Sequence, residues 1–250
     1  MINVSSLTVM LGGKQVVRNV SFTVENGQWL MLTGPNGAGK TSIVNAVSQN
    51  LPYTGSVSID GVNLSGMKSR LLARKIGVLS QNRPVSYAFK AEEVVRLGCY
   101  SHRSGFFSPP EADSEALFQN AVRATGIEGF LSRPVTTLSG GEIQRVFLAQ
   151  LFAQDPQILI LDEPANHLDL PFQKQIFELT DAWRKEKSRI VISVVHDLSL
   201  AKYYGTHALL LDRGATAAFG TADEVLTEEK LSAVYGMNIA EWMKKLYELW

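Results

Sequence analysis

One glycine-rich stretch, residues 34–41, constrains the fold of this chain more than any other part. It reads Gly-Pro-Asn-Gly-Ala-Gly-Lys-Thr and fits the pattern G-x-x-x-x-G-K-[ST]. An apolar run over 29–32 precedes it, and 42–47 has the composition of a helix. Glycines let the backbone turn so that successive N–H groups face one anion, and the helix start adds its positive dipole end. The alternative is a chance glycine turn, but the flanking strand and helix favour a phosphate-binding loop.

Two side chains at the end of this stretch carry the expected chemistry. Lys40 supplies a point charge for β- and γ-phosphates, and the hydroxyl of Thr41 can bind Mg²⁺. We predict that a nucleotide contacts the whole loop and the start of the helix: Gly34, Pro35, Asn36, Gly37, Ala38, Gly39, Lys40, Thr41 and Ser42.

Composition sets limits on the class of protein. The 250 residues have a formal net charge of zero, so the whole chain offers no electrostatic attraction for nucleic acid, and we expect no nucleic-acid partner. The single cysteine, Cys99, excludes an internal disulfide and fits a reducing compartment. No apolar run approaches the ~20 residues that a membrane-spanning helix needs.

Hydrophobic periodicity changes along the chain. Residues 2–25 and 56–60 alternate as strands do, and we expect them to form an antiparallel sheet beside the phosphate-binding core. From about residue 85, apolar residues recur at helical spacing instead, with Pro109-Pro110 and Gly126 as stop signals. We therefore predict one domain, with 1–84 and 156–250 forming the core and its β subdomain, and 85–155 forming a helical subdomain.

A second glycine pair opens a helix in the middle of the chain. Leu138-Ser139-Gly140-Gly141-Glu142 precedes a helical run over 143–153, which places another anion-binding helix N-terminus in the same chain. The alternative is an ordinary helix cap, with Ser139 as the cap and Glu142 closing a capping box. The position of the motif, just before a buried strand that ends in acids, favours a functional role.

Two apolar strands end in polar side chains. Residues 157–161 lead into Asp162 and Glu163, and 189–195 lead into His196. Ligands bind at the carboxyl ends of parallel strands, so one carboxylate can hold Mg²⁺ while the other deprotonates a water. His196 can hydrogen-bond the γ-phosphate or that water. Solvated charges and a structural histidine are the alternatives.

These motifs, in this order, resemble the nucleotide-binding subunit of ABC transporters. The resemblance covers nearly the whole chain: 34–41 is similar to the Walker A motif, Gln81 to the Q-loop, 138–142 to the signature, 158–162 to the Walker B motif, 166–169 to the D-loop and His196 to the H-loop. It implies the ABC ATPase fold, an α/β P-loop NTPase core with an antiparallel β subdomain and an α-helical subdomain.

The resemblance also implies a role for each site residue. Thr41, Gln81 and Asp162 would organise Mg²⁺. Glu163 would be the general base and His196 the γ-phosphate sensor, so the expected catalytic residues are Lys40, Gln81, Glu163 and His196. ATP and Mg²⁺ are the expected ligands.

The resemblance implies partners as well. Ser139, Gly140 and Gly141 would contact the ATP bound by a second copy in a head-to-tail homodimer. Membrane permease subunits, and indirectly a substrate-binding protein, would complete an importer. The chain would then lie at the cytoplasmic face of the cell membrane as a peripheral subunit. The segment from Gln81 to Arg103 would receive the permease, with Tyr87, Phe89, Tyr100, Phe106 and Phe107 as contacts.

The chain departs from the family pattern at the adenine. The family stacks an aromatic residue on the base in the first β-turn, and alignment places Leu11 there, with Val16 as a further apolar contact. Loss of the ring predicts weaker discrimination between bases, because aromatic stacking contributes on the order of 1 kcal/mol beyond burial.

Three further stretches suggest a subclass. Residues 95–103, 165–169 and 234–238 are similar to ATPases that drive import of iron siderophores, haem and cobalamin. A soluble ABC ATPase of repair or translation and an exporter subunit are the alternatives. The former usually carry two cassettes or a coiled-coil insertion, and the latter are often fused to membrane helices.

The end of the chain is expected to be a helix over 239–250. Its apolar stripe is predicted to pack back onto the core, with a homodimer contact as the alternative. The stripe consists of Trp242, Met243, Leu246, Leu249 and Trp250.

Overall fold

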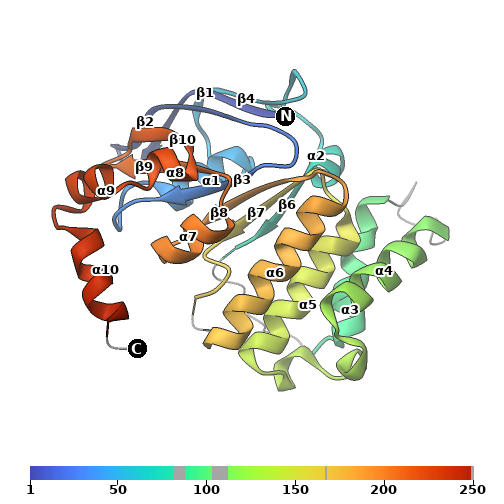
Figure 1. Ribbon diagram of the computed structural model, residues 1–250. Helices are drawn as coiled ribbons and strands as arrows, with labels where there is room; N and C mark the ends of the chain where they lie inside the picture. Colours follow the sequence, from blue (N-terminus) through green and yellow to red (C-terminus); the bar gives the residue numbers. More distant parts are fainter. Residues whose placement is uncertain (81–87, 103–111, 167, 249–250) are drawn as a thin grey trace. The chain divides into compact units, whose positions relative to one another are not determined.

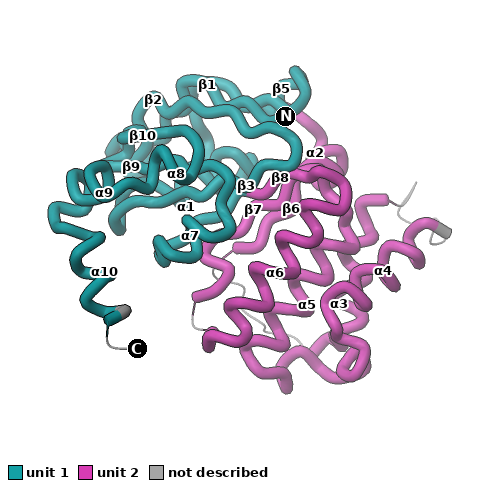
Figure 2. Tube along the Cα trace, in the orientation of Figure 1, with its two compact units in different colours: residues 1–65, 192–250 teal, residues 66–191 magenta. Residues whose placement is uncertain are grey.

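The structure, a computed structural model, describes residues 1–80, 88–102, 112–166 and 168–248 (Figure 1). Contacts divide the chain into two compact units, the first formed by 1–65 with 192–250 and the second by 66–191 (Figure 2). The second unit contains the predicted helical segment and also strands and helices on either side of it. The subdomain boundaries expected from the sequence therefore stay a prediction.

The first unit contains the expected antiparallel sheet. Its strands pair in the order β2-β1-β4-β5. They are β1 (Ile2–Leu11), β2 (Lys14–Val24), β4 (Thr54–Ile59) and β5 (Val62–Asn63). Gly12 and Gly13 take positive φ angles of 54° and 77° in the turn between β1 and β2, and Asp60 and Gly61 do the same, at 50° and 79°, between β4 and β5. Gly13 and Gly61 suit these turns, because glycine adopts a positive φ without steric cost.

A second group of strands in this unit leads to the site. It contains β3 (Trp29–Thr33), β9 (His207–Asp212) and β10 (Ala215–Thr221), with β8 (Ile190–Val194) entering from the second unit. Strands β3 and β9 are parallel, and β9 and β10 form an antiparallel hairpin. The N–H of Val195 donates to the carbonyl of Leu32 at 3.3 Å. The carboxyl ends of β3 and β8 therefore lie side by side, and the chain leaves both at the same edge.

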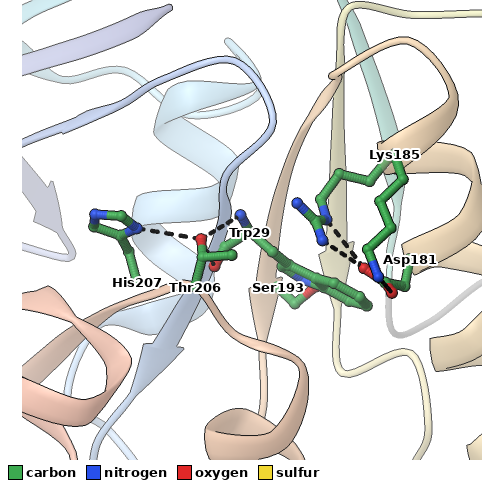
Figure 3. Close-up of polar contacts among 7 residues, drawn as sticks. Trp29, Asp181, Lys185, Ser193, Thr206 and His207 are labelled. Atoms are coloured by element: carbon green, nitrogen blue, oxygen red, sulfur yellow. Dashed lines mark hydrogen bonds and ion pairs between the residues drawn. The ribbon is translucent and has the colours of Figure 1, made fainter.

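Trp29 fixes the start of β3. Its side chain is fully buried, and its indole N–H donates to Ser193 Oγ of β8 at 2.8 Å (Figure 3). Its backbone N–H donates to Thr206 Oγ1 at 2.8 Å, and that hydroxyl is also 3.2 Å from His207 Nδ1 (Figure 3). Buried polar groups cost free energy unless they are paired, so these bonds hold β3 in register with β8 and with the start of β9.

The helices of the first unit are α1 (Lys40–Val47), α7 (Leu198–Tyr204), α8 (Ala222–Val225), α9 (Glu228–Tyr235) and α10 (Ile239–Tyr247). The helix expected at the end of the chain is α10, capped by Asn238, whose side chain accepts from the Glu241 N–H at 3.0 Å. Its apolar stripe does not pack back as expected, because Trp242 is 52% exposed and Leu246 44% exposed. Leu249 and Trp250 lie outside the described residues.

The second unit places helices against a short parallel pair of strands. Strands β6 (Ile76–Leu79) and β7 (Ile158–Asp162) pair in parallel, with Leu79 opposite Leu161. The helices are α2 (Ser69–Lys75), α3 (Ala91–Gly98), α4 (Ala112–Thr125), α5 (Gly140–Gln154) and α6 (Leu170–Glu186), with short 3₁₀ turns at Cys99–His102, Glu128–Phe130 and Val135–Thr137. Every residue of β7 is buried, as its apolar sequence predicted.

Two ion pairs form within α6, one of them to the buried Arg184. Asp181 bonds Arg184 and Lys185, each at 2.6 Å, one turn along the helix (Figure 3). Among the helices that the structure describes, none combines the length and the apolar character that crossing a membrane requires.

Candidate functional site: a phosphate loop and a set of strand-end residues

The glycine-rich stretch forms a loop between β3 and α1. Gly34, Gly37 and Gly39 have φ angles of 134°, 78° and 97°, a region that glycine enters without steric cost. A Cβ on Gly34 would lie 2.3 Å from the carbonyl oxygen of Leu211 in β9. The sequence therefore needs glycine here for two reasons, the backbone conformation and the close approach of a neighbouring strand.

The start of α1 suits an anion. Gly39 caps the helix with no side-chain hydrogen bond, and no acidic residue stands in the first turn. The first N–H groups of a helix carry a partial positive charge and lack partners within the helix. Asn36, Gly37 and Thr41, which come just before and at this start, are exposed. The loop is therefore open to a phosphate, as the motif predicts.

Lys40 folds back onto its own loop. The residue is 6% exposed, and its ammonium group donates to the carbonyls of Gly34 and Pro35 at 2.7 and 2.9 Å. A phosphate oxygen is a stronger partner for an ammonium than a neutral carbonyl. A phosphate can therefore replace these two carbonyls as partners of Lys40.

The loop also contacts the predicted base-binding region. A Cβ on Gly39 would lie 2.7 Å from the carbonyl oxygen of Val16, and the N–H of Gly214 donates to the carbonyl of Ala38 at 3.2 Å. Val16 is therefore beside the phosphate loop, whereas Leu11, the residue aligned with the aromatic ring, is 42% exposed at the end of β1.

His196 follows β8 in the first unit. It is exposed, and it comes directly after Val195, whose N–H bonds the carbonyl of Leu32. The chain leaves β3 for the phosphate loop two residues after Leu32. The structure therefore brings His196 and the start of the loop to one edge of the first unit.

In the second unit the carboxylates stand at the end of β7, as predicted. Asp162 is 4% exposed, and Glu163 is half-buried with a φ of 54°. A left-handed conformation is uncommon for a residue other than glycine, and such residues cluster at functional sites. A side-chain oxygen of Glu163 accepts a hydrogen bond from the Asn166 amide.

The signature stretch caps α5 and forms the start of that helix. Ser139 Oγ accepts from the Glu142 N–H at 3.3 Å, and Glu142 accepts from the Ser139 N–H at 2.8 Å, which is the expected capping box. The hydrogen bonds from Ser139 lower the pKa of Glu142 below its ordinary value. The Ser139 side chain therefore takes part in the cap, and binding a phosphate would use a hydroxyl that already contacts Glu142.

The two glycines of the signature differ. A Cβ on Gly140 would meet no atom within 4 Å, whereas one on Gly141 would lie 2.6 Å from the ring of Phe172. Gly141 is buried for this reason and Gly140 is exposed. Packing in the second unit therefore already requires glycine at 141, in addition to any contact with a nucleotide.

Gln81, the predicted Q-loop residue, lies outside the described residues.

Sequence reasoning missed one contact of the phosphate loop. The Tyr235 hydroxyl lies near the backbone N–H of Gly34: burial raises the pKa of Tyr235, and the Gly34 N–H partly offsets that rise. Tyr235 ends α9, about 200 residues after the loop. The sequence marks 234–238 only through a family resemblance, which assigns no contact to it.

Comparison with known families decides the assignment. The model of a family described as ABC transporter matches residues 17–166, more than half of the chain. The chain belongs to the ABC transporter family. The predicted resemblance is confirmed, and so is the expectation of an ATP-binding, ATP-hydrolysing protein, at the level of the family.

Several curated ABC ATP-binding proteins are similar over most of the chain. The hemin import ATP-binding protein HmuV of Rhodococcus jostii is 38% identical, over 92% of this chain and 78% of the relative. The ferric enterobactin transport ATP-binding protein FepC of Escherichia coli is 34% identical, over 93% and 86%. An uncharacterized ABC transporter ATP-binding protein, YvrA of Bacillus subtilis, is 37% identical over 91% of this chain, which spans about half of that relative, 52%.

Solved structures agree on the fold. The structure of cbiO1 from Clostridium perfringens superposes with a TM-score of 0.80 at 23% identity, covering 99% of this chain and 98% of that chain. The predicted fold class, an ABC ATPase fold with a P-loop core, is confirmed.

Proposed function

We propose that this ABC protein binds and hydrolyses ATP to drive uptake of haem or an iron chelate through a membrane permease. The observation that carries the proposal is the set of ABC relatives aligned over more than nine-tenths of the chain. They are named for import of hemin, of ferric enterobactin and of iron(3+)-hydroxamate. Cobalamin stays an alternative cargo, and the chain would act as a peripheral subunit at the cytoplasmic face of the membrane.

The phosphate loop supplies the binding step. The N–H groups of residues 36–41 would surround the β-phosphate, and Lys40 would leave the carbonyls of Gly34 and Pro35 for the β- and γ-phosphate oxygens. The exchange is favourable because an anionic phosphate oxygen attracts an ammonium group more strongly than a neutral carbonyl oxygen does. Val16 and Leu11 would contact the base through apolar surface alone.

Residues suited to Mg²⁺ are present. Thr41 offers an exposed hydroxyl, and Asp162 a carboxylate at the end of β7. Within the described residues, no cluster of three or more His, Cys, Asp or Glu could hold a metal by itself. That donor set fits Mg²⁺, which is usually bound through one or two protein oxygens together with substrate phosphates. Bound there, with Gln81 as a further ligand, the ion would neutralise phosphate charge.

Hydrolysis requires a base and a γ-phosphate contact. We assign Glu163 as the general base that orients and deprotonates the attacking water, and His196 as the donor to the γ-phosphate. Phosphoryl transfer depends mostly on positioning and charge neutralisation, and within one chain we assign these roles to four residues: Lys40, Gln81, Glu163 and His196.

A second copy would complete the site. The exposed O–H of Ser139 and the N-terminal N–H groups of α5 would bind the γ-phosphate held by the partner in a head-to-tail homodimer. Helix α5 has 15 residues, so its N-terminus carries a full dipole. A site completed in this way makes an isolated monomer a poor ATPase.

The surface of the second unit offers apolar contacts for a permease. Phe89, Leu97 and Tyr100 are 51%, 58% and 41% exposed. Tyr87, Phe106 and Phe107, also expected at this surface, lie outside the described residues. Replacing Tyr100 with Ala should weaken permease binding, and an unchanged complex would count against this contact.

A pull-down tests the assembly. The chain with Glu163→Gln is captured from detergent-solubilised membranes of the source cell in MgATP, which should hold the closed state. A polytopic membrane protein in stoichiometric amount supports the proposal. Recovery of ribosomes, DNA or soluble proteins alone contradicts it and favours a repair or translation ATPase.

Uptake identifies the cargo. Cells lacking the chain should lose uptake of labelled hemin or of a labelled ferric siderophore, and the wild-type chain should restore it while Lys40→Ala should not. Normal uptake of both would contradict the proposed cargo class, and loss of cobalamin uptake alone would select the alternative.

A further inference from the structure

The segment that follows β7 is a turn built around one side chain. The backbone N–H of Asn166 donates to the carbonyl of Glu163 at 3.2 Å, and the side-chain amide of Asn166 donates to Glu163 Oε2. Asn166 thus bonds Glu163 twice, once through the main chain and once through the side chain.

Side chains of the neighbouring helices donate hydrogen bonds to the backbone of this segment. Gln144 Nε2 of α5 donates to the carbonyl of Pro164 at 3.0 Å, and Gln173 Nε2 of α6 donates to the carbonyl of Leu168 at 2.8 Å. These bonds hold the backbone of the turn. The Asn166 amide acts on the side chain instead, and its bond to Oε2 restrains rotation of the Glu163 carboxylate.

We propose that Asn166 is a positioning residue that fixes the orientation of the Glu163 carboxylate for catalysis. The inference rests on the proposed function, in which Glu163 is the general base. The amide engages one carboxylate oxygen, Oε2, and this contact sets the plane of the carboxylate. The left-handed backbone of Glu163, with a φ of 54°, fits a residue held in place by its surroundings.

The consequence for the kinetics is specific. General-base catalysis depends on the position of the base relative to the reacting water, and a small misplacement is costly. Binding of ATP depends on the phosphate loop and not on Asn166. Loss of the amide should therefore lower kcat and leave the affinity for MgATP and the folding of the chain unchanged.

The first test uses the full chain in complex with its permease. Asn166→Ala should lower kcat about tenfold or more, while the Kd for MgATP stays within about twofold of wild type. Asn166→Asp, which has the same shape but places a carboxylate against Glu163, should be at least as slow. Wild-type turnover in either variant would overturn the inference.

A matched control separates positioning from general stiffness. Gln173→Ala removes a bond to Leu168 in the same turn without touching the Glu163 carboxylate, and its kcat should change less than about twofold. An equal loss in both variants would mean that any loosening of the turn slows the enzyme, and would contradict a role for Asn166 at the carboxylate.

A double variant links the effect to Glu163. In single-turnover hydrolysis, Asn166→Ala added to Glu163→Gln should cause no further loss, because the group that Asn166 orients is already inactive. A further loss of about tenfold would contradict the inference. If Glu163→Gln alone turns over like wild type, the general-base assignment fails. If it is inactive while Asn166→Ala is normal, only the present inference fails.

Discussion

The ammonium group of Lys40 donates hydrogen bonds to the carbonyl oxygens of Gly34 and Pro35, 2.7 and 2.9 Å away. The lysine is 6% exposed, and these two bonds hold its ammonium group against its own loop. A nucleotide would supply charged oxygens in their place. The ammonium group therefore lies beside the loop that the motif predicts to bind phosphate.

Removal of the Lys40 charge should weaken only the binding of nucleotides that carry β- and γ-phosphates. Lys40→Met should weaken MgATP binding at least about tenfold, since hydrogen bonds to charged groups contribute ~1.5–3 kcal/mol. Binding of AMP, which has no β- or γ-phosphate, should change less than about twofold. Titration calorimetry with both nucleotides measures the difference, and an equal loss for both would show that the substitution disrupts the loop generally.

The two glycines of the signature should respond differently to a methyl group. Gly141→Ala should lower the free energy of unfolding by about 1–3 kcal/mol, because its Cβ would overlap the Phe172 ring and overpacking is destabilising. Gly140→Ala meets no atom and should be neutral or stabilising by up to about 1 kcal/mol. Urea denaturation of both variants measures their free energies of unfolding, and equal stabilities would contradict the packing described at Gly141.

Asp155 should make the stability of the second unit depend on pH in the acid range. Burial by itself raises the pKa of this carboxyl, but hydrogen bonds and charges from Lys187 and Arg189 lower it below its ordinary value. The folded state therefore favours the ionised form. Its stabilising contribution is present above the unfolded pKa of ~4 and is lost as the pH falls through the lower folded pKa.

The variant Asp155→Asn keeps the size of the side chain and tolerates the φ of 44° at this position. It should lower the free energy of unfolding by about 1–3 kcal/mol at pH 7, and the difference should shrink below about pH 3. Glu178→Gln, in an exposed pair with Lys174, is the control and should change stability by less than about 0.5 kcal/mol. A difference that does not vary with pH would contradict the ion-pair explanation.

Base selectivity should be weak. With Leu11 in place of an aromatic ring, Kd values for ATP and GTP should agree within about fivefold, because the stacking term of ~1 kcal/mol is missing. Leu11→Tyr should restore preference for ATP by a similar factor. Fluorescence competition between the two nucleotides measures this, and a strong ATP preference in the wild-type chain would contradict it.

Much of the fold and of the site could be predicted from local pattern. The turns at Gly12-Gly13 and Asp60-Gly61, the glycine loop and the buried strand before Asp162 all depend on residues next to one another in the chain. Glycine composition and apolar periodicity report such features directly.

Contacts between distant residues could not be predicted in this way. The proximity of the Gly34 N–H to the Tyr235 hydroxyl joins residues about 200 positions apart, and no periodicity encodes it. The Asn166 contact with Glu163 is local but depends on a rotamer, and a motif does not report rotamers. The prediction that the apolar stripe of α10 packs onto the core was wrong for a related reason. An amphipathic pattern predicts an apolar face that needs a partner, but it does not identify the partner.

The most direct test of the account is turnover of MgATP by the wild-type chain and by Glu163→Gln, measured together with ATP binding in the assembled transporter. We predict steady hydrolysis by the wild-type protein. The variant should bind ATP with wild-type affinity but lose hydrolysis by a factor on the order of 100 or more, within the range that a positioned general base contributes. Hydrolysis by Glu163→Gln at the wild-type rate would contradict the central claim that this carboxylate activates the water.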